Sequence, residues 1–521
     1  MLRLPPHHDL HRSRPARNQR RPTPVPGRLP RPAAPTARRH RRRPRPRAHP
    51  DHRPRPAGTP APCPPRGSQP VNPSHTSPAS TETAPADRLG DPGVILRVRQ
   101  ADAPPAQAHT GMASLELAVP VGENTAFNIG SVAKQITAYL CILAARDRVL
   151  TLARPVADIL PRFHIPDVTI GDLIQHRGGI RDAESLLSLA GFRELDHYTA
   201  DDLLQLAYRQ RHRAVEPGRF LYSNTGYLLL AQVLTDVYGS ELHEIADRHV
   251  FTPLGMTSAR FKTDPREVIP GAAASYQAVA GRWQHQQRPA ALPGPGSLWC
   301  TAADLDRWLA HLWHKWQPAA DDTLPFAQHL GYHPSDHPPF TYGAGLYADP
   351  RPGRTAVFHY GHEQGFSAAT HLTSSGLRII CLSNHAQIAA DHVAAAALTE
   401  FTQDSGTDTG ELLSRALLSR LAPEPAHPAG VDAEAAHATL GTYSCDEVPG
   451  TVRLTRSAGS LHLWRRRTPD RLDRIGPAIY AANGYSLTVA LPLTDGKVPP
   501  PDSFVLDLDR APGLRYRRRS D

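Results

Sequence analysis

Lysine is the scarcest charged residue of this chain. Among 59 lysines and arginines in 521 residues, only four are lysine: Lys134, Lys262, Lys315 and Lys497. Arginine forms surface ion pairs equally well, but it stays protonated in proteins and cannot serve as a base. The few lysines are therefore candidates for roles that need a nitrogen able to lose its proton.

Phenylalanine, tyrosine, tryptophan and lysine are missing from residues 1–85. This segment holds 22 prolines and 18 arginines against three acidic residues, a net charge of +15, whereas the rest of the chain is at −5. Such a composition buries too little apolar surface to offset its ordering entropy, so residues 1–86 are predicted to form a disordered tail. The run "RRHRRRPRPR" (38–47) is typical of nucleic-acid or anionic-membrane binding, but charge runs often match by chance, and a functionless extension is favoured.

The chain also lacks long hydrophobic runs and paired cysteines. No run reaches the roughly 18 apolar residues of a membrane span, and the arginines at 20 and 21 precede prolines rather than the apolar core of a secretory signal. The five cysteines (63, 141, 300, 381 and 445) are odd in number and have no metal-ligand spacing, so neither a disulfide framework nor a zinc site is predicted. We expect a cytoplasmic protein, or an extracytoplasmic one if translation starts elsewhere.

Alternating and helical patterns predict an α+β domain over residues 87–403. Strands are expected as an antiparallel pair at 93–100 and 113–121, and again at 355–360, 366–372 and 377–384. Helices are expected at 131–150, 201–210, 227–238 and 302–313. Strands at both ends of a helical middle indicate one antiparallel sheet covered by helices.

A second, smaller domain is predicted after a linker. Residues 404–431 contain "QDSGTDTG" and "APEPAHPAG", which are typical of a connecting segment. Residues 432–521 consist of short alternating runs separated by glycine, proline and aspartate. This pattern predicts a small antiparallel barrel or sandwich.

The stretch "AFNIGSVAKQITAYL" places Ser131 three residues before Lys134 at the start of a predicted helix. Residues i and i+3 of a helix share a face. A buried lysine loses its proton readily because desolvation disfavours the ammonium form, and it can then take the serine proton. With 28 serines in the chain, four lysines give a chance Ser-x-x-Lys about one time in five, so this motif alone is weak evidence.

Two further motifs follow in the chain. "EPGRFLYSNTGYLLL" (216–230) places Tyr222 and Asn224 before a helix, where the phenol can relay protons and the amide can bind a substrate amide. The alternative is a turn with a packed tyrosine. "FHYGHEQGFSA" (358–368) places His359 and Gly361 on a strand, and a glycine there allows close approach of a substrate.

The strand motif also suggests an oxyanion hole and one competing interpretation. The backbone N–H groups of His362 and Ser131 can together bind an oxyanion. A metal site made of His359, His362 and Glu363 is the alternative. No predicted helix supports that His-x-x-His spacing, so no metal site is favoured.

Ser-x-x-Lys, Tyr-x-Asn and His-x-Gly in this order resemble the serine β-lactamase and penicillin-binding-protein superfamily. The similarity extends to "VTIGDLIQHRGGIRD", "FTPLGM" and "GSLWCTAADLDRW" and covers about residues 90–400. It is strongest to the class C-like branch of esterases, D-aminopeptidases and other serine hydrolases. The β-rich end of the chain is similar to the lipocalin-like domain that often follows in this branch.

The resemblance implies a serine hydrolase that cleaves an ester, amide or small peptide bond of a small molecule or short peptide. It makes Ser131 the acylated nucleophile, Lys134 its base or proton partner and Tyr222 a proton shuttle. Asn224 would orient the substrate beside the His359–Gly361 strand, and the N–H groups of Ser131 and His362 would form the oxyanion hole. No metal or organic cofactor is implied.

Three departures from the family pattern bear on the substrate. His359 stands where β-lactamases and transpeptidases usually carry lysine, so a permanent cation for a substrate carboxylate is missing from this strand. "HRGGI" (176–180) and Pro295 also replace common residues and are expected to reshape the pocket. Two alternatives therefore stand beside an esterase or peptidase: a non-catalytic penicillin-binding-like receptor or scaffold, and a β-lactamase or D,D-peptidase.

Overall fold

The computed structural model describes residues 90–520, except 193–195, 287–289, 317–323, 352–354, 404–410, 412–437, 458–459, 466–468, 477, 483–486 and 492–500. The predicted tail and almost all of the predicted linker lie outside the described residues. The described residues all belong to one compact unit. Within the described part of the chain, no helix has both the length and the apolar character needed to cross a membrane.

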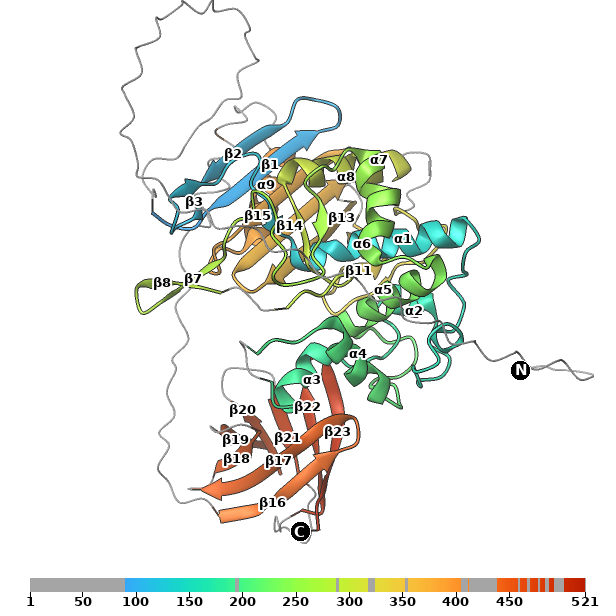
Figure 1. The fold of residues 1–521 in the computed structure, drawn as a ribbon, viewed down its shortest axis with the longest axis vertical. Helices are drawn as coiled ribbons and strands as arrows, with labels where there is room; N and C mark the ends of the chain where they lie inside the picture. The colour runs from blue at the N-terminus through green and yellow to red at the C-terminus, as the bar shows by residue number, and fades with distance from the viewer. Residues whose placement is uncertain are drawn as a thin grey trace, which may run out of the picture. The chain divides into compact units, whose positions relative to one another are not determined.

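An eight-stranded antiparallel sheet forms the centre of the first domain (Figure 1). Its strands, in spatial order, are β10 (His333–Pro334), β11 (Thr341–Gly343), β12 (Leu346–Asp349), β13 (Ala356–Glu363), β14 (Phe366–Thr373), β15 (Leu377–Ser383), β1 (Val94–Gln100) and β2 (Ala106–Thr110). Strands β14 and β15 are buried along nearly their whole length because helices cover both faces. The predicted α+β class and the antiparallel sheet are confirmed.

The predicted partner of the first strand is wrong. Strand β1 pairs with β15 and with β2, whereas the segment expected to pair with it forms the separate small sheet β3 (Met112–Ser114) and β4 (Val119–Pro120). The prolines at 104 and 105 indicated a loop, and the partner strand begins directly after them. Five residues with a weak alternation gave too little signal to identify this strand in advance.

Helices α8 (Ala302–Trp316) and α9 (Ala390–Gln403) pack against the sheet. The other helices of this domain are α1 (Lys134–Arg146), α2 (Ile170–Ile174), α3 (Ala183–Leu189), α4 (Ala200–Arg209), α5 (Asn224–Tyr238), α6 (Leu242–Ala246) and α7 (Thr252–Leu254). Alternate residues of β15 divide between two cores: Ile379 packs with Val393 of α9, and Ile380 belongs to the core that contains Trp308 of α8. The four predicted helices are confirmed to within a few residues.

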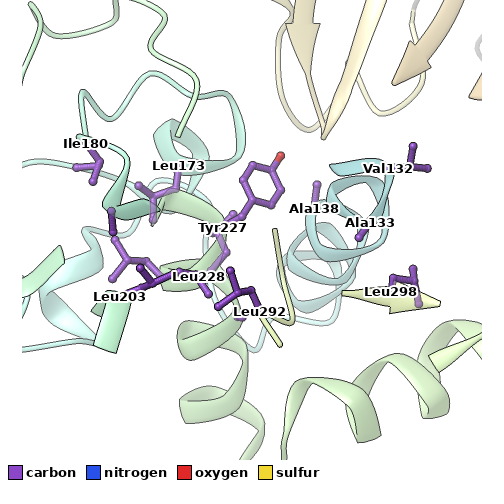
Figure 2. Close-up of a cluster of buried hydrophobic side chains, with 14 of the residues drawn as sticks. Val132, Ala133, Ala138, Leu173, Ile180, Leu203, Tyr227, Leu228, Leu292 and Leu298 are labelled. Atoms are coloured by element: carbon purple, nitrogen blue, oxygen red, sulfur yellow. The ribbon is translucent and has the colours of Figure 1, made fainter. Parts of the chain in front are cut away.

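Short elements complete this domain. They are the turn helices η1 (Gly130–Ala133), η2 (Val156–Asp158) and η3 (Asp247–Phe251), a three-stranded sheet of β5 (Phe127–Asn128), β9 (Leu298–Cys300) and β6 (Arg260–Phe261), and a hairpin of β7 (Tyr276–Val279) and β8 (Arg282–His285). Helix α1 is buried on almost its whole circumference, as its sequence predicted. Figure 2 shows its Ala138 in one apolar cluster with Tyr227 and Leu228 of α5. This packing holds the beginning of α1 beside the beginning of α5.

The C-terminal region is a closed eight-stranded barrel, which confirms the predicted small β domain. Its strands are β16 (Ala438–Cys445), β17 (Val448–Ser457), β18 (Ser460–Trp464), β19 (Asp470–Gly476), β20 (Ile479–Ala482), β21 (Leu487–Ala490), β22 (Ser503–Leu508) and β23 (Ala511–Arg518). Each strand pairs with the next in the chain, and β16 pairs with β23 to close the barrel. Closure leaves no unpaired sheet edge.

The turn between β22 and β23 contacts the start of α3. The backbone N–H of Asp182 donates to the carbonyl of Arg510 at 2.8 Å. Arg181 donates to the carbonyl of Pro512 at 2.7 Å and forms an ion pair with Glu447 at 2.7 Å. These contacts fix the position of Arg510 relative to α3.

Candidate active site

Ser131 and Lys134 meet as their spacing predicted. Ser131 lies in the turn η1, which leads directly into α1 at Lys134. The Lys134 side chain is completely buried, and its Nζ lies 2.8 Å from the Ser131 Oγ. A nucleophile and its potential base are therefore within hydrogen-bonding distance.

Two other groups hold the Lys134 amine in place. Its Nζ also donates to Asn224 Oδ1 and to the backbone carbonyl of Pro295, each at 2.8 Å. Burial, and to a smaller extent the charge of Arg510, lowers the pKa of Lys134 to about 7, although nearby carboxylates such as Glu184 act in the opposite direction. About half of the Lys134 side chains are thus uncharged at neutral pH.

Tyr222 lies in the loop before α5, with its ring next to this amine. Lys134 Nζ is 5.0 Å from the centroid of the Tyr222 ring. Burial raises the pKa of Tyr222 above its usual value, despite a hydrogen bond with Ser131 that lowers it. The ring of His176, from the "HRGGI" segment, supports Tyr222 at a centroid distance of 4.2 Å. Tyr222 is therefore a protonated phenol at neutral pH.

Asn224 is the first residue of α5, and both ends of its amide are engaged within the protein. Its Oδ1 accepts from Lys134, and its Nδ2 donates to Glu184. Its backbone N–H donates to the Asp182 carboxylate at 2.6 Å. The same carboxylate caps α3 by accepting from the N–H of Ser185. Asp182 thus fixes the beginnings of two helices at the site.

Strand β13 brings His359 to the same site as an uncharged side chain. Its Nδ1 donates to the carbonyl of Tyr360 at 2.7 Å, so its Nε2 accepts from the hydroxyl of Tyr342 at 3.2 Å. Burial, with the Lys134 charge as a second cause, lowers the pKa of His359 to about 3. At neutral pH, this strand accordingly places no cation in the pocket at the position of His359.

Gly361 allows the strand to approach the nucleophile turn. A Cβ at this position would lie 2.0 Å from the carbonyl oxygen of Ile129 and 3.1 Å from the backbone nitrogen of Ser131. A Cβ on Gly130 would likewise lie 2.9 Å from the backbone nitrogen of His362. The close partner of the strand glycine is thus the protein's own backbone, and the contact brings the N–H groups of Ser131 and His362 into the same region.

The metal-site alternative does not fit this arrangement. His359 is buried and His362 is exposed on the same strand, since residues three apart in a strand point to opposite faces. Among the described residues, no group of three or more histidine, cysteine, aspartate or glutamate side chains is arranged to hold a metal ion.

These residues line a pocket of about 1210 Å³. Ser131, Tyr222, Asn224, His359 and His362 all contribute atoms to its lining, whereas Gly361 does not. Its wall also contains aromatic side chains and several carboxylates, namely Phe220, Phe340, Tyr347, Phe358, Tyr360, Glu184, Asp336, Glu363, Asp391 and Asp509. The pocket can accept a small ligand with both apolar and charged groups.

Sequence reasoning missed the contribution of Arg510, which lies in the barrel and lines the same pocket. Its guanidinium carbon is 4.9 Å from the centroid of the Tyr222 ring. The residue is separated from Lys134 by most of the chain, and no motif around it indicates a site. Pro295, which was expected to reshape the pocket, lines it, and its backbone carbonyl also accepts a hydrogen bond from Lys134.

Comparisons with known proteins agree with this geometry. The profile of the Beta-lactamase family matches residues 79–403. A D-aminopeptidase of Cereibacter sphaeroides is 26% identical over 299 residues, covering 55% of this chain and 56% of the relative. The D-aminopeptidase of another strain is 25% identical over 385 residues, covering 72% and 68%. The chain thus spans little more than half of the first relative's length.

A solved structure shows the same fold. The octameric penicillin-binding protein homologue from Pyrococcus abyssi is 19% identical, with a TM-score of 0.53, and the match covers 82% of this chain and 96% of that one. The sheet, the helices that cover it and the Ser-x-x-Lys arrangement are those expected of the family whose profile matches most of this domain. The chain belongs to the Beta-lactamase family.

Proposed function

We propose that this protein cleaves an ester, amide or short-peptide bond of a small substrate through an acyl-enzyme on Ser131. The observation that carries the proposal is the 2.8 Å contact between Ser131 and a fully buried Lys134 whose pKa is lowered to about 7. The D-aminopeptidase relatives support amide or short-peptide substrates that contain D-amino acids.

The pKa values support the following order of proton steps. Uncharged Lys134 accepts the hydroxyl proton of Ser131 while Oγ bonds to the substrate carbonyl carbon. The negative charge that develops on the carbonyl oxygen is stabilised by the N–H groups of Ser131 and His362. Tyr222, which retains its proton, protonates the leaving group as the scissile bond breaks, and it regains a proton from Lys134. Water then attacks the acyl carbon and releases Ser131.

Asn224 has a positioning role in this scheme. Its carbonyl oxygen directs the Lys134 amine toward Ser131, and Glu184 fixes the amide in that orientation. His359 remains neutral and orients the strand through its contact with Tyr342. A direct contact between the Asn224 amide and substrate remains a prediction.

A fluorophosphonate probe followed by peptide mass mapping tests the proposal. We expect a single adduct on Ser131, absent in Ser131→Ala and strongly slowed in Lys134→Ala. Lys315→Ala, which removes an exposed lysine from α8, serves as the matched control and should react like the natural protein. Absence of an adduct on folded protein would refute the proposal. Acylation by esters and D-amino-acid amides without subsequent release would instead indicate the receptor class.

A further inference from the structure

Arg510 places a cation in the pocket, and its guanidinium forms no hydrogen bond with any described residue. Its guanidinium lines the pocket and lies over the Tyr222 ring. Its five N–H groups have no hydrogen-bond acceptor among the described residues, although its backbone carbonyl accepts from Asp182. The backbone contact holds the turn in place, and the side chain extends toward Tyr222.

The neighbouring carboxylates keep Arg510 charged, while those of Asp182 and Glu184 are bound to other groups. Burial opposes the charge, but Asp182, Tyr222, Glu184 and Asp509 together act against burial, and the pKa of Arg510 is raised. The Asp182 oxygens accept backbone N–H groups of Ser185 and Asn224, and Glu184 accepts from the Asn224 amide. Within the described residues, neither carboxylate forms an ion pair with the guanidinium.

Arg510 supplies the pocket with a positive charge that strand β13 does not supply at the position of His359. His359, on strand β13, is neutral at pH 7 because burial lowers its pKa to about 3. Arg510 and His359 line the same pocket as Ser131, and Tyr222 contacts both of their side chains. A guanidinium with free N–H groups has the geometry to bind a carboxylate through two parallel hydrogen bonds.

We propose that Arg510 is a specificity-determining residue that binds a free carboxylate of the substrate, so that the barrel supplies the cation absent from strand β13. The inference rests on the proposed function in taking the Ser131 pocket as the substrate site. It selects peptide substrates with a free C-terminal carboxylate over the corresponding C-terminal amides.

Equilibrium binding to Ser131→Ala tests this proposal without depending on hydrolysis. Three matched pairs serve as probes: D-phenylalanine, D-leucine and acetyl-D-alanyl-D-alanine, each compared with its C-terminal amide by titration calorimetry. For at least one pair, we expect the acid to bind about tenfold or more tightly than the amide, as for a charge-assisted hydrogen bond. Equal affinities, or no detectable binding of any acid, would overturn the proposal.

Variants of the barrel turn localise the effect. In Ser131→Ala/Arg510→Gln the preference for the acid should fall to about onefold, and Arg510→Lys should restore part of it because the charge returns without the planar geometry. Arg515→Gln removes an exposed arginine from β23, the strand that follows the turn, and should leave the preference intact. A purely structural role of Arg510 would weaken acid and amide equally, and that result would refute the proposal.

The two proposals can fail separately. Fluorophosphonate labelling of Ser131 tests the nucleophile, whereas the acid-to-amide ratio tests Arg510. Labelling without an acid preference would reject the carboxylate site alone. An acid preference without labelling would retain the carboxylate site and reject the hydrolase.

Discussion

The first domain, which contains the eight-stranded sheet, and the barrel contribute to one pocket in contrasting ways. The first domain buries its ionisable groups: Lys134 is inaccessible to solvent, and His359 nearly so. The barrel contributes Arg510 from a partly exposed turn. Burial changes which protonation state a group adopts, whereas partial exposure leaves an arginine charged and able to meet a ligand. The comparison teaches that burial sets the protonation state of Lys134 and His359, whereas the barrel turn adds a charged side chain to the same pocket.

The largest expected effect comes from replacing the buried Lys134 by a residue that keeps a positive charge. Lys134→Arg retains a cation but cannot accept the Ser131 proton, so the rate of ester hydrolysis should fall by about 10²- to 10⁴-fold. Steady-state kinetics with a p-nitrophenyl ester measure it. Lys315→Arg is the control, and an active Lys134→Arg would show that the lysine is not the base.

The next effect comes from the close contact between β13 and the nucleophile turn. In Gly361→Ala the new methyl group would collide with the carbonyl of Ile129, which should reduce the free energy of unfolding by about 1–3 kcal/mol. It should also slow labelling of Ser131. Gly122→Ala is the control, because a Cβ there meets no atom within 4 Å. Chemical denaturation of both variants checks the difference, and equal stabilities would contradict the contact.

The pH dependence of the reaction reports on burial directly. Lys134 must be unprotonated to act, and its pKa is lowered to about 7. The value of kcat/KM should therefore rise through pH 7 and be about tenfold below its plateau at pH 6. A plateau that continues unchanged to pH 5 would exclude Lys134 as the titrating base. His359 cannot account for a limb near pH 7, because its pKa is about 3.

The smallest expected effect is that of Arg510, in the barrel, on the pKa of Lys134 in the first domain. The positive charge of Arg510 helps to lower the pKa of Lys134, so Arg510→Gln should move the acidic limb of the kcat/KM profile to higher pH. At pH 6.5 this change corresponds to a rate about two- to threefold lower than that of the natural protein. Arg515→Gln should leave the limb in place. An unchanged limb in Arg510→Gln would mean that the barrel affects binding alone.

Local patterns predicted much of the fold and part of the site. Ser131 and Lys134 were recognisable because three residues of a helix bring them to one face, and the helix was recognisable because it is apolar on nearly every side. The strand that pairs with β1 was not recognisable, since a five-residue strand has little periodicity and its pairing depends on contacts far along the chain. The closeness of Gly361 to Ile129 could not be predicted either, because the two residues lie in separate elements that meet only in the folded protein.

The sequence by itself determined which residues can react: a serine and a lysine at helical spacing, a tyrosine and an asparagine at a helix start, and a strand without its usual lysine. Only the tertiary structure decided the charge states of these residues and which other side chains surround them. Desolvation depends on everything packed around a group, so the pKa of Lys134 follows from residues distant in the chain. The same is true of Arg510, which becomes part of the pocket because the backbone of its turn binds Asp182.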